Sequence, residues 1–146
     1  MLFEAGRGPA FTLSCDVREN ATVIRVGGEL GFTSAPLLRE RLDRFRGPGT
    51  TFVIVDLTDV TFCDSVGLSE LVSALQRSEA AGTRFVLSGV HGYLARVLTI
   101  TGLRKTFEIH PSAEDALRHA PAARSDGGRS GSPDPDGTPP PAAPTP

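Results

Sequence analysis

Apolar residues in the first half of the chain form three short runs with the pattern of β-strands. Residues 12–17 and 22–26 are rich in β-branched side chains and are separated by the turn residues Glu19 and Asn20, which predicts an antiparallel hairpin. Residues 52–57 are almost entirely apolar at both odd and even positions, which is typical of a strand covered on both faces. We therefore expect residues 52–57 at the centre of a sheet.

Runs with a helical period follow these strands. The first helix is expected to begin at Thr33 or Ser34 as N-cap, with Pro36 in its first turn, and to stop at the Gly-Pro-Gly sequence of residues 47–49. Further helices are predicted from residue 65, from residues 91 to 101 and after the N-cap Ser112, and Gly82 is expected to end the second helix as a left-handed C-cap. The apolar positions of the first three helices are Ala35, Leu38, Leu42 and Phe45, then Leu68, Leu71, Val72 and Leu75, then Leu94, Val97 and Leu98.

Two more strands are predicted at residues 84–87 and 106–109, so strands and helices alternate along most of the chain. Such passages favour parallel neighbours joined by right-handed crossovers. The expected fold is therefore α/β, a single domain of residues 11–120 in which a small mixed β-sheet carries about four helices. Residues 1–10 are expected to be a flexible N-terminus, and residues 121–146, rich in Pro, Gly and Ser, a disordered tail.

Composition and charge disfavour several classes of function. A formal net charge of −2 without a basic cluster argues against direct binding to nucleic acid or to a membrane surface. No apolar run approaches the ~20 residues of a membrane span, and the N-terminus lacks the pattern of a signal peptide, so we expect a cytoplasmic protein. The thiols Cys15 and Cys63 form no metal-binding motif, so no metal is expected, and Cys63 is expected to pack at the end of a strand.

The candidate functional residue lies between the predicted central strand and the second predicted helix. A hydroxyl at Ser65 would stand among the free N–H groups at the positive end of the helix dipole, a position that favours an anionic group. Ser65 is therefore a candidate phosphate acceptor. The alternative is that Ser65, or Asp64 beside it, serves only as the N-cap, which contributes roughly 1 kcal/mol to the stability of a helix.

The segment Asp64-Ser65-Val66-Gly67-Leu68 and its context resemble the signature of the STAS domain, and in particular of the bacterial anti-sigma factor antagonists. The resemblance spans residues 11–119. The other matching segments, in the expected order, are Gly28-Glu29-Leu30, then Ile54-Val55-Asp56-Leu57 followed by a turn through Asp59 and Val60-Thr61-Phe62, then Gly82 before a strand, and Thr101-Gly102-Leu103.

This resemblance implies a STAS-like domain with a partner-switching role and no catalytic residue. The unmodified protein would bind an anti-sigma factor that is also a serine kinase and so free a sigma factor for transcription. The kinase would phosphorylate Ser65 and end the binding, and a serine phosphatase would restore it. The protein would be a monomer when alone, would need no cofactor, and would be a kinase substrate rather than an enzyme. The residues expected to contact the partner are Asp64, Val66, Gly67, Leu68, Thr33 and Ser34, with a core position for Leu68 and helix capping for Thr33 and Ser34 as alternatives.

Two other functions compete with this interpretation. Gly31 stands where many antagonists carry an Asp, which favours a STAS sensor or scaffold module without a phosphorylation cycle, whereas the retained Asp-Ser-x-Gly motif disfavours it.

An esterase is the enzymatic alternative. Its G-x-S-x-G nucleophile elbow is incomplete here because residue 63 is Cys, and His91, the best-placed base, comes without a recognisable oxyanion loop.

Overall fold

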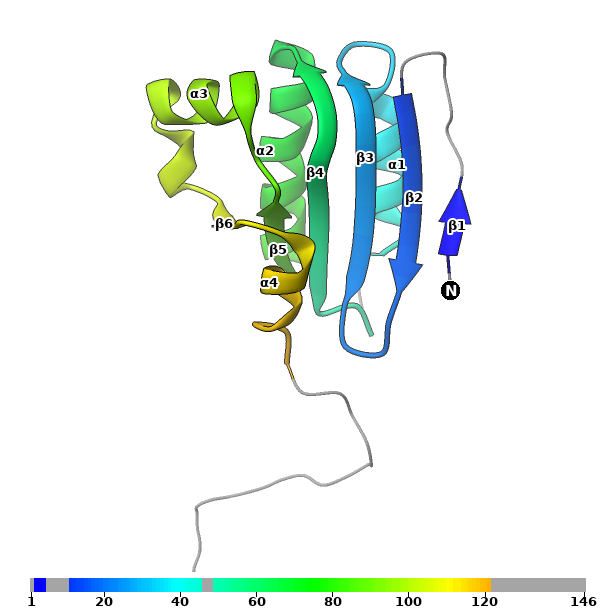
Figure 1. Cartoon of the computed structure of the whole chain (residues 1–146). Helices are drawn as coiled ribbons and strands as arrows, with labels where there is room; N and C mark the ends of the chain where they lie inside the picture. The colour runs from blue at the N-terminus through cyan, green and yellow to red at the C-terminus, as the bar shows by residue number, and fades with distance from the viewer. Residues whose placement is uncertain (1, 5–10, 46–48, 122–146) are drawn as a thin grey trace, which may run out of the picture.

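The computed structural model describes residues 2–4, 11–45 and 49–121 of the 146-residue chain. They form a six-stranded sheet in the order β1-β2-β3-β4-β5-β6 (Figure 1). The strands are β1 (Leu2–Glu4), β2 (Phe11–Val17), β3 (Thr22–Leu30), β4 (Phe52–Cys63), β5 (Arg84–Ser88) and β6 (Glu108–His110). The helices are α1 (Ala35–Asp43), α2 (Ser65–Ala80), α3 (Gly92–Thr101) and α4 (Ala113–Leu117), with a short 3₁₀ turn, η1 (Leu103–Lys105).

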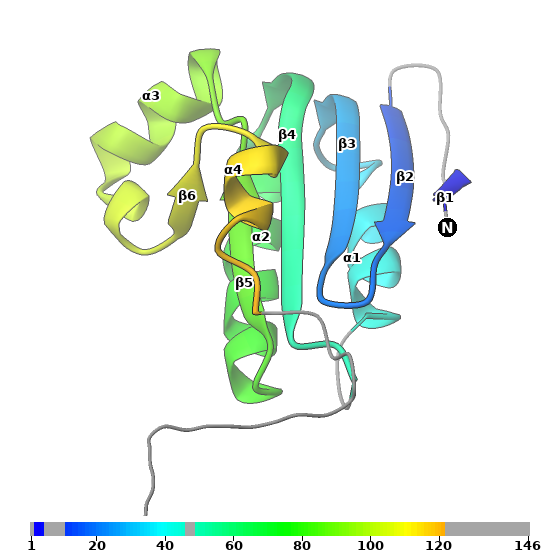
Figure 2. The same cartoon turned by 60° about the horizontal axis from the view of Figure 1, so that its bottom comes forward.

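The sheet is mixed, as the sequence predicts. Strands β1, β2 and β3 are antiparallel neighbours, whereas β3, β4, β5 and β6 run parallel. The β2–β3 hairpin closes through a hydrogen bond of 2.8 Å from the Arg18 N–H to the Ala21 carbonyl. Parallel strands need crossover connections, and α1 and α2 lie together on one face of the sheet while α4 lies on the other (Figures 1 and 2).

The core has two layers because the central strand β4 is buried on both faces. Val53, Val55 and Leu57 belong to the larger cluster, which also contains Leu38 of α1 and Leu71 of α2. The smaller cluster, beneath α4, consists of Ala21, Val23, Phe52, Ile54, Val86, Ala113 and Ala116. This arrangement confirms the prediction that residues 52–57 form the centre of the sheet.

The central strand is longer than the sequence predicts. We expected it to end at Leu57 with a turn through Asp59, but β4 continues to Cys63 and remains paired with β3, which itself continues to Leu30. Two register shifts between β3 and β4 accommodate the irregular polar segment of β4 that follows Leu57. Backbone pairing with β3 therefore outweighs the turn preference around Asp59. As a result, β4 ends only two residues before α2 begins.

The structure contradicts a prediction at the N-terminal end of the domain and confirms one at the C-terminal end. Leu2–Glu4, inside the segment expected to be flexible, pairs with β2 as an edge strand, so the expectation is wrong for these residues: pairing satisfies their backbone groups and those of β2. At the other end, the Ser112 Oγ accepts the Asp115 N–H at 3.1 Å and confirms the predicted N-cap of α4. The rest of residues 1–10 and, apart from residue 121, the predicted tail of residues 121–146 lie outside the described residues.

Candidate functional site

The site is built where β4 ends and α2 begins. Asp64 has an extended backbone (φ −92°, ψ −175°) and is the N-cap of α2, its Oδ1 accepting the Gly67 N–H at 2.9 Å. Ser65 is the first residue of the helix and is exposed, and within the described part of the chain nothing forms a hydrogen bond with its hydroxyl. Asp64 is therefore the cap, and the Ser65 hydroxyl is left free.

Asp64 also holds the turn between β3 and α1 against the start of α2. Its Oδ2 accepts the Phe32 N–H at 3.3 Å, and its own N–H donates to the Leu30 carbonyl at 3.2 Å. A Cβ placed on Gly31 would lie only 2.6 Å from that Oδ2. Glycine at position 31 thus allows the Asp64 carboxylate to approach the turn this closely.

Gly67 allows a close approach inside the domain. A Cβ on Gly67 would come within 2.3 Å of the Leu30 carbonyl oxygen, so a residue without a side chain lets α2 lie against the end of β3. We expected Gly67 to contact a partner, with its missing side chain giving the partner's backbone room to approach. That expectation is wrong, because Gly67 is buried and its own strand β3 occupies the space.

Ser34 and Thr33 differ in accessibility. Ser34 is 3% exposed, and its hydroxyl accepts the Gly31 N–H at 2.8 Å and donates to the Glu29 carbonyl at 2.7 Å. It stands at the N-cap position of α1 but forms no side-chain capping bond. Ser34 therefore stabilises the β3–α1 turn from inside and is not presented to a partner, contrary to expectation, whereas Thr33 is exposed.

Exposed apolar side chains lie beside Ser65 on the α1 side. Phe32 is 76% exposed and Val66 is 40% exposed. They line an open groove of about 420 Å³, together with Ala35, Pro36, Arg39, Ser69, Glu70 and Ser73. Leu68, by contrast, is half-buried and packs against the core. Val66, rather than Leu68, therefore presents apolar surface next to Ser65.

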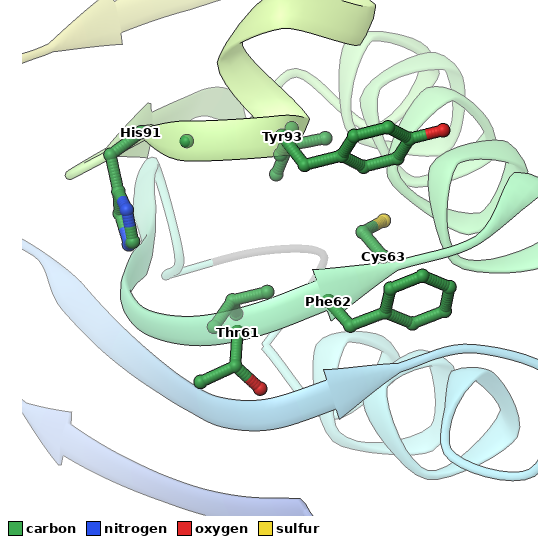
Figure 3. A pocket seen from close by; sticks show the side chains of 8 residues that line it. Thr61, Phe62, Cys63, His91 and Tyr93 are labelled. Carbon is green, nitrogen blue, oxygen red and sulfur yellow. The ribbon is translucent and has the colours of Figure 1, made fainter.

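A second recess lies between the end of β4 and the start of α3 (Figure 3). It has a volume of about 70 Å³, and its lining includes Phe62 and Tyr93, whose ring planes are within 9° of parallel and whose centroids are 6.4 Å apart. Burial, with the charge of Asp64 adding to it, raises the pKa of the Cys63 thiol in this recess to about 11. Cys63 is therefore a neutral packing residue at the strand end, as the sequence predicts.

The exposed aromatic residues Phe32, Phe62 and Tyr93 are the part of this surface that the sequence analysis missed. Hydrophobic periodicity identifies side chains that point inward, and these three stand at the ends of elements where no period is established. The signal that could have found them is their position next to predicted element boundaries around the Asp-Ser-x-Gly motif.

His91, the base considered for an esterase, has a partner other than Ser65. The Nε2 of His91 forms a hydrogen bond of 2.7 Å with the Thr58 carbonyl, and nothing in residues 11–45 and 49–121 connects this ring to Ser65. Across the same residues, no group of three or more His, Cys, Asp and Glu side chains could hold a metal ion. Nor does the described chain contain a helix with the length and apolar character that a bilayer span requires.

The mixed sheet and the Asp-Ser-x-Gly junction at the start of α2 define the class of domain, and comparison with known proteins agrees. The STAS domain family model matches residues 12–116, so the chain belongs to the STAS domain family. The anti-sigma-B factor antagonist of Staphylococcus aureus is 32% identical over 91 residues, which cover 62% of this chain and 84% of that protein. The anti-sigma-B factor antagonist of Staphylococcus epidermidis is 33% identical over 91 residues, with the same two shares.

Solved structures show the same fold. An anti-sigma factor antagonist from Mycobacterium paratuberculosis matches with a TM-score of 0.68 at 27% identity, covering 76% of this chain and 95% of that chain. The Bacillus cell fate determinant SpoIIAA in its phosphorylated form matches with a TM-score of 0.59 at 24% identity, covering 75% of this chain and 97% of that chain. The expected STAS-like α/β fold is thereby confirmed, and the relatives are anti-sigma factor antagonists.

Proposed function

We propose that this protein is an anti-sigma factor antagonist that binds an anti-sigma factor with serine kinase activity and loses that binding when Ser65 is phosphorylated. The observation that carries the proposal is the exposed Ser65 hydroxyl at the start of α2, which forms no hydrogen bond with any residue that the structure describes, while Asp64 supplies the cap. Relatives named anti-sigma-B factor antagonists support this class of partner.

In this proposal, Ser65 accepts a phosphoryl group from ATP held by the kinase. Its Oγ attacks the γ-phosphorus, the bond to the β-phosphate oxygen breaks so that ADP leaves, and a base of the kinase takes the hydroxyl proton. The antagonist has only to present an accessible hydroxyl. The 16-residue helix α2 offers N–H groups and its dipole to the new phosphate, so the domain accommodates the product without unfolding.

Phosphorylation ends the binding because it places charge in an apolar contact. Phe32 and Val66 present apolar surface beside Ser65, and burying an unpaired charge against such a surface is costly. A phosphoserine carries about −1.5 to −2 charges at neutral pH, and the Asp64 carboxylate stands next to it. A cost of several kcal/mol corresponds to a loss of affinity of about a hundredfold or more.

A serine phosphatase completes the cycle in this proposal. It hydrolyses the Ser65 phosphate, returns the hydroxyl and makes the antagonist competent to bind again. The antagonist itself is a monomer when free, acts in the cytoplasm, and catalyses none of these steps.

Phosphosite mapping of the protein isolated from its own cells tests the identity of the acceptor. Intact-mass and peptide analysis is expected to place the phosphate on Ser65. Phosphate on a different residue, or none under any growth condition, would contradict the proposal and favour the STAS sensor or scaffold module without a phosphorylation cycle.

Binding measurements with the kinase that co-purifies from those cells test the charge argument. Ser65→Ala is expected to keep the affinity of the parent, and Ser65→Glu to weaken it by at least about tenfold. Thr51→Glu is the matched control, because it adds the same charge at an exposed position just before the other end of β4. Equal affinities for Ser65→Ala and Ser65→Glu would contradict the mechanism.

A further inference from the structure

We propose that the outer face of α3 and η1 is a contact surface for an acidic region of the anti-sigma factor kinase. The identity of that partner rests on the proposed function. The surface gives apolar and positively charged side chains to the same partner that covers Ser65. We call it the α3 face, and it consists of Tyr93, Arg96, Val97, Ile100, Arg104 and Lys105.

Helix α3 has apolar side chains on two sides. Leu94 and Leu98 belong to the larger core cluster. Tyr93 and Ile100 are instead 58% and 76% exposed, and they stand two helical turns apart. Val97 lies between them on the same side of the helix and is only half-buried. Figures 1 and 2 both show α3 on the side of the domain away from β1 and β2. The helix therefore presents an outward apolar stripe that the core does not use.

The same face carries an excess of positive charge. Arg96, Arg104 and Lys105 are exposed, and no Asp or Glu occurs in the sequence between Glu79 and Glu108. Within the part of the chain that the structure describes, none of the three cations forms an ion pair or a side-chain hydrogen bond. Their charge is therefore available to a partner, and it is complementary to carboxylates.

Helix geometry keeps the cations beside the apolar stripe. Arg96 comes three residues after Tyr93, a spacing that makes two side chains neighbours on a helix surface. At the other end, Gly102 has a left-handed backbone (φ 79°) and ends α3, so that η1 with Arg104 and Lys105 follows at once. Helix α3 has 10 residues and is therefore about 15 Å long, and the two kinds of side chain share this length.

Three cations beside an apolar stripe fit an acidic protein surface better than a nucleic acid or a membrane. A nucleic acid needs a larger basic footprint, and it offers little to the aliphatic side chain of Ile100. A helix that lies in a membrane surface buries a longer apolar face than α3, whose stripe has three residues with one of them half-buried. A protein surface can combine carboxylates with an apolar pocket.

The α3 face adjoins the surface around Ser65. The ring of Tyr93, at the start of α3, has its centroid 6.4 Å from that of Phe62, which precedes Ser65 by three residues. Figure 3 shows Phe62 of β4 and Tyr93 of α3 pointing in the same direction. An interface of ordinary size, about 800 Å² on each partner, is roughly 30 Å across. A partner that covers Ser65 therefore extends over α3, where its carboxylates meet the cations.

Tyrosine fluorescence of the full chain reports on the α3 face, because Tyr93 is the single tyrosine of a chain without tryptophan. The acidic probe is a helical peptide with leucine at every third or fourth position and glutamate between, free of tyrosine and tryptophan. Its titration is expected to change the Tyr93 signal with saturation. The same peptide with lysine in place of glutamate is expected to bind at least about tenfold more weakly at low salt. These probes require neither kinase nor phosphate, so failure of the α3 face and failure of the proposed function are separate results.

Substitutions identify the side chains that bind the acidic probe. Arg104→Glu and Lys105→Glu in one chain are expected to weaken binding at least about tenfold, and Ile100→Ala about threefold. The matched controls are Arg18→Glu, at an exposed cation of the β2–β3 turn, and Thr99→Ala, which shortens an exposed side chain of α3 outside the stripe. Both controls are expected to bind the probe like the parent.

The kinase that co-purifies from the protein's own cells tests the identity of the partner. The double variant Arg104→Glu, Lys105→Glu is expected to bind this kinase about tenfold more weakly than the parent. Added salt is expected to weaken binding of the parent more than binding of the variant, because salt screens exposed charges.

An acidic probe that does not saturate, or that binds no better than the lysine peptide, would overturn the proposal. A folded double variant, verified by its circular dichroism, that binds the probe or the kinase unchanged would do the same. The full chain could also bind vesicles of equal parts phosphatidylglycerol and phosphatidylcholine, or a DNA duplex, as tightly as the acidic probe. That result would assign the α3 face to a membrane or a nucleic acid and overturn the protein partner.

Discussion

Replacing Gly67 with alanine forces the start of α2 away from β3. At an unobstructed helical position this substitution stabilises a protein by up to ~1 kcal/mol, because alanine has the higher helix propensity. Here the new Cβ would lie 2.3 Å from the Leu30 carbonyl oxygen and 2.9 Å from the carbonyl carbon. Both are backbone atoms that cannot rotate aside, so strand or helix must move.

Two costs oppose the gain in helix propensity. Overpacking of a tight contact costs about 1–3 kcal/mol. The Leu30 carbonyl also accepts the Asp64 N–H at 3.2 Å, and displacing it weakens a hydrogen bond worth about 1 kcal/mol net. After subtraction of the propensity gain, we expect Gly67→Ala to lower the free energy of unfolding by about 1–3 kcal/mol.

Urea unfolding followed by circular dichroism measures this difference, with the free energy extrapolated linearly to water. Ser69→Ala is the matched control, because it introduces alanine at an exposed position of the same helix and is expected to leave the stability equal or slightly higher. A Gly67→Ala protein at least as stable as the parent would refute the requirement for glycine at this contact.

The ion pair between Arg84 of β5 and Glu108 of β6, with Nε 2.8 Å from Oε1, predicts a specific acid sensitivity. The Arg84 hydrogen bond, opposed by burial and assisted by His110, lowers the pKa of Glu108 from 4.5 to about 2. The pair therefore stabilises the fold above the unfolded pKa, and this contribution is lost as the pH falls through the folded value. Arg84→Met is expected to remove this part of the pH dependence of unfolding; an unchanged acid profile would argue against the pair. The last prediction concerns the buried thiols Cys15 and Cys63. Both are expected to resist modification by DTNB at mildly alkaline pH until the protein unfolds. Rapid reaction of either thiol in the native protein would contradict their burial.

Several elements are predictable from the sequence because their signals are local. The β2–β3 hairpin follows from two β-rich runs around a short turn, and the central place of β4 follows from its apolar residues at both parities. The length of β4 is not predictable in this way. Its second half contains the polar residues Thr58 and Asp59, and the strand continues through them because β4 pairs with β3 again from Asp59 onward, opposite Gly27, after a register shift.

The candidate site also has features that the sequence predicts and others that only the fold decides. Local pattern alone places Ser65 after a buried strand and at the start of an amphipathic helix, since both features are written in neighbouring residues. Tertiary contacts decide that the Asp64 carboxylate also holds the turn at Phe32 and that Gly67 meets Leu30. These outcomes depend on how closely β3, α1 and α2 approach one another.

The pairing of Phe62 with Tyr93 shows the physical reason for this division. The two rings belong to β4 and α3, and β5 and the whole of α2 lie between them in the chain. A periodic pattern reports whether a residue points toward the core, and it carries no information on which exposed side chains from distant elements come to lie side by side. Sequence determines the helix start that presents the hydroxyl, whereas only the folded sheet with its crossovers brings together the surface around it.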